Sequence, residues 1–88
     1  MKPLKHDHKL IESTSIQNVS IDLFEVIDDT NKICYYVFLN HVQSSNKLKN
    51  RHAANEYINI EIRTLKQYLN REMNPIFIDD YKKRFGLS

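Results

Sequence analysis

Hydrophobic and polar residues in the first half of the chain alternate with the period of two that is typical of β-strands. The alternation is clearest over residues 19–28, VSIDLFEVID, and residues 32–43, KICYYVFLNHVQ, are dense in β-branched and aromatic side chains. The DDTN sequence between them is rich in turn-forming residues, so we predict a β-hairpin. A third stretch, residues 10–17, is rich in serine and threonine and is predicted as an edge strand.

From residue 53 onward the apolar positions follow the period of an α-helix. Nine positions of this stretch share one helical face, and seven of them are apolar or tyrosine; the exceptions are Glu61 and Glu72. Residues 58–63 also alternate as a strand would, so a strand is the competing interpretation, but that alternation is brief. We predict a long helix over about 53–73, ended by Pro75.

The C-terminal residues predict a short helix over about 78–85. Aspartates lie in its first turn, lysines and an arginine lie in its last, and Gly86 follows it, as helix polarity favours. The expected architecture is α+β, with a small antiparallel sheet of two to three strands packed against one long and one short helix. We expect one domain over residues 1–88, with residues 1–8 as a disordered leader.

The predicted strand over 32–43 is apolar on both faces, whereas a strand exposed on one side normally carries polar residues there. Its side chains divide into Ile33, Tyr35, Val37 and Leu39 on one face and Cys34, Tyr36, Phe38 and Val42 on the other. The long helix covers one face. The short helix either covers part of the other or leaves an apolar surface that marks an interface with a second copy or another protein. We place that interface at Tyr36, Phe38, Phe77 and Tyr81.

The composition excludes several kinds of enzyme. With Gly86 as its only glycine, the chain cannot build a phosphate-binding loop, a dinucleotide-binding turn or a nucleophile elbow. No hydroxyl, histidine or acidic residue has the spacing of a catalytic site, and His6 and His8 supply too few ligands for zinc. We therefore expect a non-enzymatic protein without a cofactor or a metal.

The single cysteine, Cys34, suits a reducing compartment, and no apolar run approaches the roughly 20 residues that cross a bilayer. We expect a cytoplasmic protein without a membrane-spanning segment. Isoleucine, asparagine and lysine, which all have A/T-rich codons, are abundant. This composition fits an accessory protein of a phage or another mobile element.

The segment SSNKLKNRHAAN, residues 44–55, carries Lys47, Lys49 and Arg51 at alternate positions, followed by His52, and it contains no acid. If a helix begins after it, the unpaired N–H groups of the first turn join these cations in a phosphate-binding surface. If a strand follows instead, the segment is an ordinary basic loop. The same cations also suit an acidic protein partner, or solvent alone.

The order of three strands, a basic loop and a helix over about residues 10–70 is similar to that of double-stranded-RNA-binding domains and of the three-strand-plus-helix DNA-binding domains of some phage-type integrases. SNKLKNRHAA resembles the lysine- and alanine-rich helix start of the RNA-binding family. The resemblance implies phosphate contacts from this loop. The chain departs from that family because no helix is predicted before the strands and Lys49 stands where a small residue is usual.

These features predict a small non-enzymatic interaction protein that acts as a regulator or inhibitor by docking on a macromolecular partner. The preferred partner is another protein. Such a protein could belong to a phage or another mobile element and block a host defence complex. The alternative is a nucleic-acid-binding module that grips phosphates with the loop 47–51 and the following helix N-terminus. A homodimer through the apolar interface is a further arrangement that the pattern allows.

Overall fold

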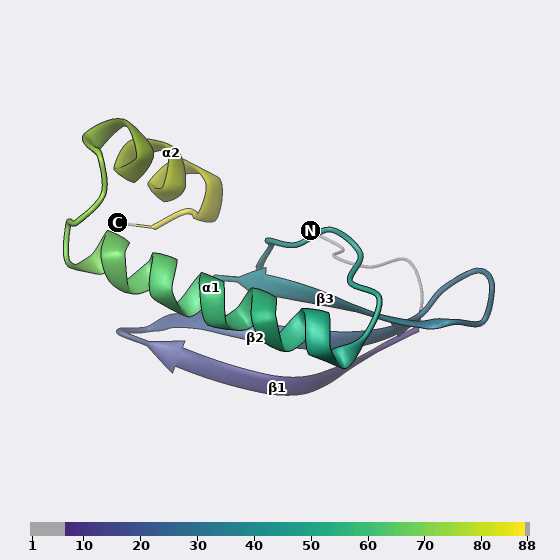
Figure 1. The fold of residues 1–88 in the computed structure, drawn as a ribbon. Coiled ribbons are helices and arrows are strands. Elements are labelled where there is room, and N and C mark those ends of the chain that lie inside the picture. The colour runs from purple at the N-terminus through teal and green to yellow at the C-terminus, as the bar shows by residue number, and fades with distance from the viewer. Residues whose placement is uncertain (1–6, 88) are drawn as a thin grey trace.

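A four-stranded antiparallel sheet and two helices make up the fold (Figure 1), and the α+β class is confirmed. The computed structural model describes residues 7–87. The strands lie in the order β1-β2-β3-β4. The elements are β1 (His8–Ile16), β2 (Val19–Ile27), β3 (Ile33–Leu39), β4 (Val42–Gln43), α1 (Arg51–Leu69) and α2 (Pro75–Phe85). Residues 1–6 of the expected leader lie outside the described residues, and His8 already belongs to β1.

The stretch expected as one strand over 32–43 is two strands joined by a tight turn. Asn40 and His41 both have positive φ angles, of 52° and 67°, as a two-residue hairpin turn requires. The chain therefore reverses after Leu39, and Val42 pairs with Leu39. The assignment of Val42 to the face of Cys34 was wrong, because the turn places it with the side chains that pack against the helices. The sheet accordingly has four strands where we expected two to three.

The long helix, α1, forms where we expected a helix, so the strand interpretation of residues 58–63 is wrong. It begins two residues before the expected start because Asn50 caps it, its side chain accepting a hydrogen bond from the Ala53 N–H over 2.8 Å. It ends at Leu69, four residues before the expected end. Arg71 just beyond it has a φ angle of 58°, which ends the helix without help from a proline.

Pro75 begins the second helix and does not end the first. A proline in the first turn of a helix loses no hydrogen bond, since the N–H groups there have no partner within the helix. Asn74 caps α2 by accepting from the Ile76 N–H over 3.0 Å, so α2 starts three residues earlier than expected. Gly86, with a φ angle of 63°, ends it as we expected.

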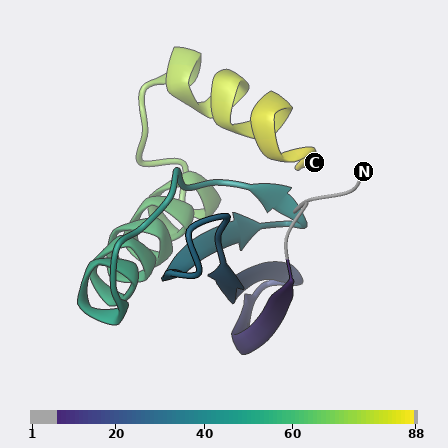
Figure 2. The same cartoon turned by 90° about the vertical axis from the view of Figure 1, so that its right-hand side faces the viewer.

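The main core lies between the sheet and the two helices. Leu23, Val37 and Leu39 from the sheet meet Leu65 from α1, and all four are fully buried. Phe85 from α2 belongs to the same core. Figure 2 shows α1 against one face of the sheet and α2 above the sheet edge, so that neither helix lies on the opposite face. The suggestion that the short helix covers part of that second face was therefore wrong.

The two edges of the sheet differ. The outer edge of β3 is occupied by β4 and by residues 44–48: the Ser44 N–H donates to the Val37 carbonyl over 2.8 Å, and Tyr35 and Leu48 exchange two backbone hydrogen bonds of 2.9 Å each. On the other side β1 is the outermost strand, and within residues 7–87 no further strand pairs with it. The sheet thus ends in the two-residue β4 and the segment after it on one side, and in the nine-residue β1, which we call the open edge, on the other.

Candidate interaction surfaces and a buried polar cluster

The predicted basic site lies in one segment, but most of its cations are paired with carboxylates. Lys47 Nζ lies 2.7 Å from Asp28 Oδ2 in the β2–β3 turn, and the Arg51 guanidinium contacts the Glu12 carboxylate on β1. His52 Nε2 lies 2.5 Å from Oε1 of Glu56, one turn further along α1. Lys49 is exposed and makes no ion pair within the described part of the chain. Three of the four predicted side chains therefore face acids of the protein itself.

The Lys47–Asp28 pair stabilises the β2–β3 turn. The Lys47 ammonium is the main reason why the pKa of Asp28 is held well below its usual range. The Thr30 hydroxyl, 2.7 Å from Asp28 Oδ1, and the backbone N–H groups of Thr30 and Lys32 lower this pKa further. In return, the Asp28 carboxylate raises the pKa of Lys47. Lys47 thus connects the basic segment to the turn that joins the two central strands.

The sheet face opposite α1, which we call the second sheet face, carries Phe24, Val26, Cys34, Tyr36 and Phe38. Val26, Cys34 and Phe38 are buried, whereas Phe24 and Tyr36 pack against them and remain half-buried. The Phe24 and Phe38 rings meet edge to face with centroids 5.2 Å apart. Burial raises the pKa of the Cys34 thiol, which favours the protonated form over the reactive thiolate. Less apolar surface is therefore exposed here than the sequence pattern implied.

The four residues predicted as an apolar interface lie in two separate places. Tyr36 and Phe38 are on the second sheet face, with Phe38 only 2% exposed. Phe77 lies at the start of α2 and is 63% exposed, beside the 69% exposed Ile76. Tyr81, one turn further along α2, packs against the main core with its ring 5.0 Å from that of Phe85. The structure does not join these four residues into one surface.

A buried polar cluster, which we had not predicted as a site, joins the residue after β4 to α1 and α2. It consists of Ser44, Tyr57, Glu61 and Tyr81. Ser44 Oγ donates to Glu61 Oε2 over 2.5 Å, and the Tyr81 hydroxyl donates to Glu61 Oε1 over 3.1 Å. The Tyr57 hydroxyl lies 2.8 Å from Ser44 Oγ and is left as its donor, because the single Ser44 proton is directed at Glu61. Glu61 was the acid that interrupted the predicted apolar face of the helix, which is the sequence signal for this cluster.

The cluster holds the Glu61 carboxylate in a buried position. Glu61 and Ser44 are each only 7% exposed. Burial raises the pKa of Tyr81 above its usual range, and the nearby Glu61 carboxylate raises it further. Burial also raises the pKa of Tyr57. Both tyrosines therefore remain hydrogen-bond donors at neutral pH, and no strong base or nucleophile is presented to a substrate.

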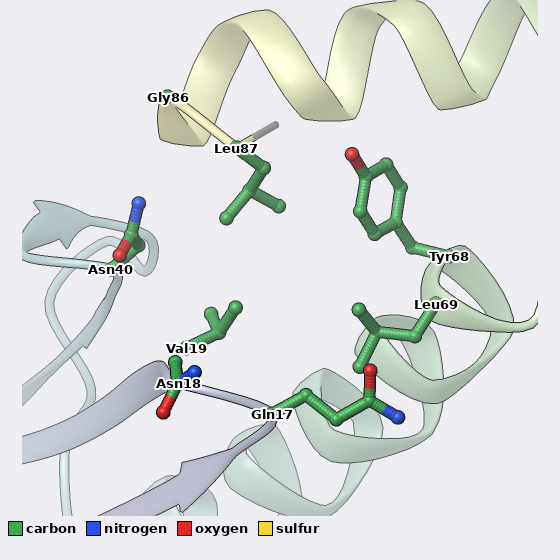
Figure 3. A pocket seen from close by; sticks show the side chains of 8 residues that line it. All are labelled: Gln17, Asn18, Val19, Asn40, Tyr68, Leu69, Gly86 and Leu87. Atoms are coloured by element: carbon green, nitrogen blue, oxygen red, sulfur yellow. The ribbon is translucent and has the colours of Figure 1, made fainter.

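A cavity of about 430 Å³ opens at the end of the sheet where the β1–β2 and β3–β4 turns meet the C-terminal ends of the two helices (Figure 3). Its walls come from the two turns and from the ends of both helices. The lining residues are Gln17, Asn18, Val19, Asn40, Tyr68, Leu69, Gly86 and Leu87. None of them is charged, and the side-chain amide of Asn40 is already engaged, donating to the Phe85 carbonyl over 2.6 Å. No histidine, cysteine or carboxylate side chain is among these lining residues.

Residues 7–87 contain neither a metal-binding cluster nor a membrane-spanning helix. Among these residues, no group of three or more histidine, cysteine, aspartate or glutamate side chains is arranged to bind a metal ion. Neither α1 nor α2 combines the length and the apolar character that a bilayer-crossing helix needs.

No family model matches the chain, and neither a curated protein nor a solved structure matches it.

Proposed function

We propose that this protein is a small non-enzymatic regulator or inhibitor that acts by docking on another protein. The observation that carries the proposal is the second sheet face. It has an apolar floor, two half-buried aromatic rings, Phe24 and Tyr36, and no helix of the described chain over it. A phage or mobile-element protein that blocks a host defence complex is one setting for such a regulator, and it rests on amino-acid composition alone.

The character of the second sheet face supports docking for a physical reason. The solvent side of an antiparallel sheet normally carries polar residues, whereas this one carries aromatic and aliphatic residues from both central strands. Aromatic rings at the centre of an apolar patch are typical anchors in protein interfaces, because they bury much surface with little loss of side-chain freedom. Phe24 and Tyr36 oppose each other on β2 and β3 and would act as one anchor.

The non-enzymatic part of the proposal is supported by the buried polar cluster. It is the one place in the described chain where a carboxylate, a serine hydroxyl and two tyrosines meet. Its oxygen atoms already bond to one another, and Ser44 and Glu61 are buried. Tyr81 and Arg84 of α2 both donate to it, so the cluster is well suited to fixing α2 in place.

The test compares two aromatic residues on different surfaces. The full chain, its Tyr36→Ser variant and its Phe77→Ser variant are each used to capture proteins from an extract of the native host. We expect Phe77→Ser to retain the specific partner and Tyr36→Ser to lose it, with both variants folded by circular dichroism. Retention of the same partner by Tyr36→Ser and by Phe24→Ser would contradict docking through the second sheet face.

A second candidate, nucleic-acid binding, is supported by the start of α1. The helix begins at Arg51, directly after the basic segment, and Lys49 is free of ion pairs within residues 7–87. Binding to generic duplex DNA or RNA would then weaken steeply with salt, and Lys47→Ala with Lys49→Ala would flatten that slope. Lys66→Ala, which removes an exposed cation near the far end of α1, is the matched control. Absence of binding at low salt would contradict this candidate.

A further inference from the structure

The open edge of the sheet is a second surface, distinct from the second sheet face. Residues 12–15 of β1 are exposed, and α1 packs mainly on β2 and β3 (Figure 1). The other edge strand, β4, has only two residues, so β1 is the long edge strand of the described sheet. Exposed edge strands carry unpaired N–H and C=O groups that can pair with another strand.

The β1–β2 turn determines which backbone groups of β1 face outward. Its two central residues both have positive φ angles, as in a two-residue hairpin, where the residues flanking the turn exchange both hydrogen bonds. Bonded and non-bonded pairs then alternate along the strands. Ile16 flanks this turn, so Thr14 and Glu12 also bond toward β2. Ser13 and Ser15 therefore direct their N–H and C=O groups outward, to the open edge.

We infer that β1 pairs antiparallel with β1 of a second copy of this chain, on a two-fold axis that passes between the two Thr14 residues. Ser13 of each copy then lies opposite Ser15 of the other, and the two pairs can form four backbone hydrogen bonds. The two Thr14 side chains face each other, which is a favourable cross-strand pair. The two four-stranded sheets become one continuous sheet. This inference goes beyond the proposed function and does not depend on it.

Charge and strand regularity favour this register over those centred on Glu12 and on Ser13. A register centred on Glu12 would place two carboxylates directly opposite each other, which is destabilising. A register centred on Ser13 would extend into the irregularity between Leu10 and Glu12, where β1 departs from regular pairing with β2. In the register centred on Thr14, Glu12 lies opposite Ile16, and no like charges meet. All residues of the regular part of β1, residues 12–16, then pair with the second copy.

The arrangement also fits the position of α1. A two-fold axis perpendicular to the sheet keeps both copies of α1 on the same side, each over its own β2 and β3. Two second sheet faces then form one surface on the other side. A ladder of five residues buries less than the roughly 1,200 Å² of stable interfaces, so we expect a dimer that dissociates on dilution.

The test is amide hydrogen exchange together with sedimentation, both measured from dilute solution up to millimolar concentration. We expect the Thr14 amide to be protected at every concentration, because it bonds within the protomer. The Ser13 and Ser15 amides should gain protection only at concentrations where sedimentation shows a dimer. Ser15→Pro removes one outward N–H, and we expect it to weaken association by at least about tenfold, whereas Ser15→Ala keeps the N–H and should dimerise normally.

A cross-link provides a second readout if Ser15→Pro does not fold. Thr14 forms a non-hydrogen-bonded pair with its counterpart, at a Cα separation of about 4.5 Å that suits a disulfide. We expect Thr14→Cys to form a covalent dimer on mild oxidation and the turn variant Gln17→Cys to form none. A monomer at all concentrations would overturn the inference. So would a dimer that forms without protection of the Ser13 and Ser15 amides.

Discussion

The Tyr81 hydroxyl on α2 donates a hydrogen bond to Glu61 on α1 over 3.1 Å, and this contact joins the two helices through a buried carboxylate. The Ser44 hydroxyl, directly after β4, donates a second hydrogen bond to the same carboxylate over 2.5 Å. Arg84 adds a further link, because its guanidinium donates to the Ser44 carbonyl over 2.8 Å. The position of α2 is thus determined by polar contacts as well as by the apolar contacts of Phe85.

Removal of the Glu61 carboxylate should destabilise the protein. Glu61→Ala leaves the buried Ser44 hydroxyl without its acceptor and removes the partner of Tyr81, which typically costs about 1–3 kcal/mol. Glu61→Gln keeps the size and one acceptor and should cost less. The measurement is the free energy of unfolding in urea, with the exposed Glu72→Ala as control. Equal losses for Glu61→Ala and Glu72→Ala would contradict a stabilising role for the cluster.

Alkaline pH should destabilise the protein through the same cluster. Burial raises the pKa of Tyr57 and of Tyr81 in the folded state, whereas tyrosines of the unfolded chain ionise near pH 10. Above that pH the unfolded state binds fewer protons than the folded state, so the free energy of unfolding falls as pH rises. Absorbance at 295 nm should show tyrosine ionisation above the usual range, and Tyr81→Phe should reduce this late signal. A variant that loses signal only in the usual tyrosine range would contradict the assignment.

The ion pair of Lys47 should be visible in the titration of its partner. The Lys47 ammonium is the largest cause of the low pKa of Asp28, so Lys47→Ala should raise that pKa towards the usual aspartate range. The Asp28 carboxyl carbon signal, followed by NMR from pH 6 downward, measures the change. Lys49→Ala is the control and should leave the Asp28 signal unchanged. Equal shifts in both variants would mean that general charge, rather than the direct contact, lowers the pKa.

Two phenylalanines on α2 should differ sharply when truncated. Phe85 is 1% exposed and belongs to the main core, so Phe85→Ala should cost about 3–5 kcal/mol by loss of buried contacts and creation of a cavity. Phe77 is mostly exposed, and Phe77→Ala should change stability by less than about 0.5 kcal/mol. Urea unfolding of both variants tests the pair. A large loss for Phe77→Ala would show that its ring packs against the protein.

The helical stripe of α1 was readable from the sequence because burial follows the period of the helix. Ala54, Leu65 and Tyr68 are buried on the predicted face. Even Glu61, which interrupts that face, is buried, because Ser44 and Tyr81 supply hydrogen bonds that come from distant parts of the chain. A sequence pattern shows that an acid lies on an apolar face, but it does not show which partners will satisfy it.

The sequence did not reveal the β3–β4 turn or the ion pairs of the basic segment, for two different reasons. Asn40 and His41 lie between a run of apolar residues and Val42, so the apolar pattern of a strand continues across the turn. The only sequence signal for the reversal was asparagine, which tolerates positive φ angles. The contact between Arg51 and Glu12 joins residues far apart in sequence. The basic segment therefore looked unopposed, although its acids are supplied by β1, by the β2–β3 turn and by α1 itself.

The shortness of β4 also limits how large an assembly of this protein can become. Fibre growth by strand addition needs two usable edges on every subunit, one to join the growing end and one to accept the next subunit. Within residues 7–87 the second edge is β4, which has only two residues, and the carbonyl of Ser44 just after it already accepts a hydrogen bond from Arg84. Pairing through β1 would use the one long edge of the described sheet, and the short β4 edge disfavours growth beyond two chains.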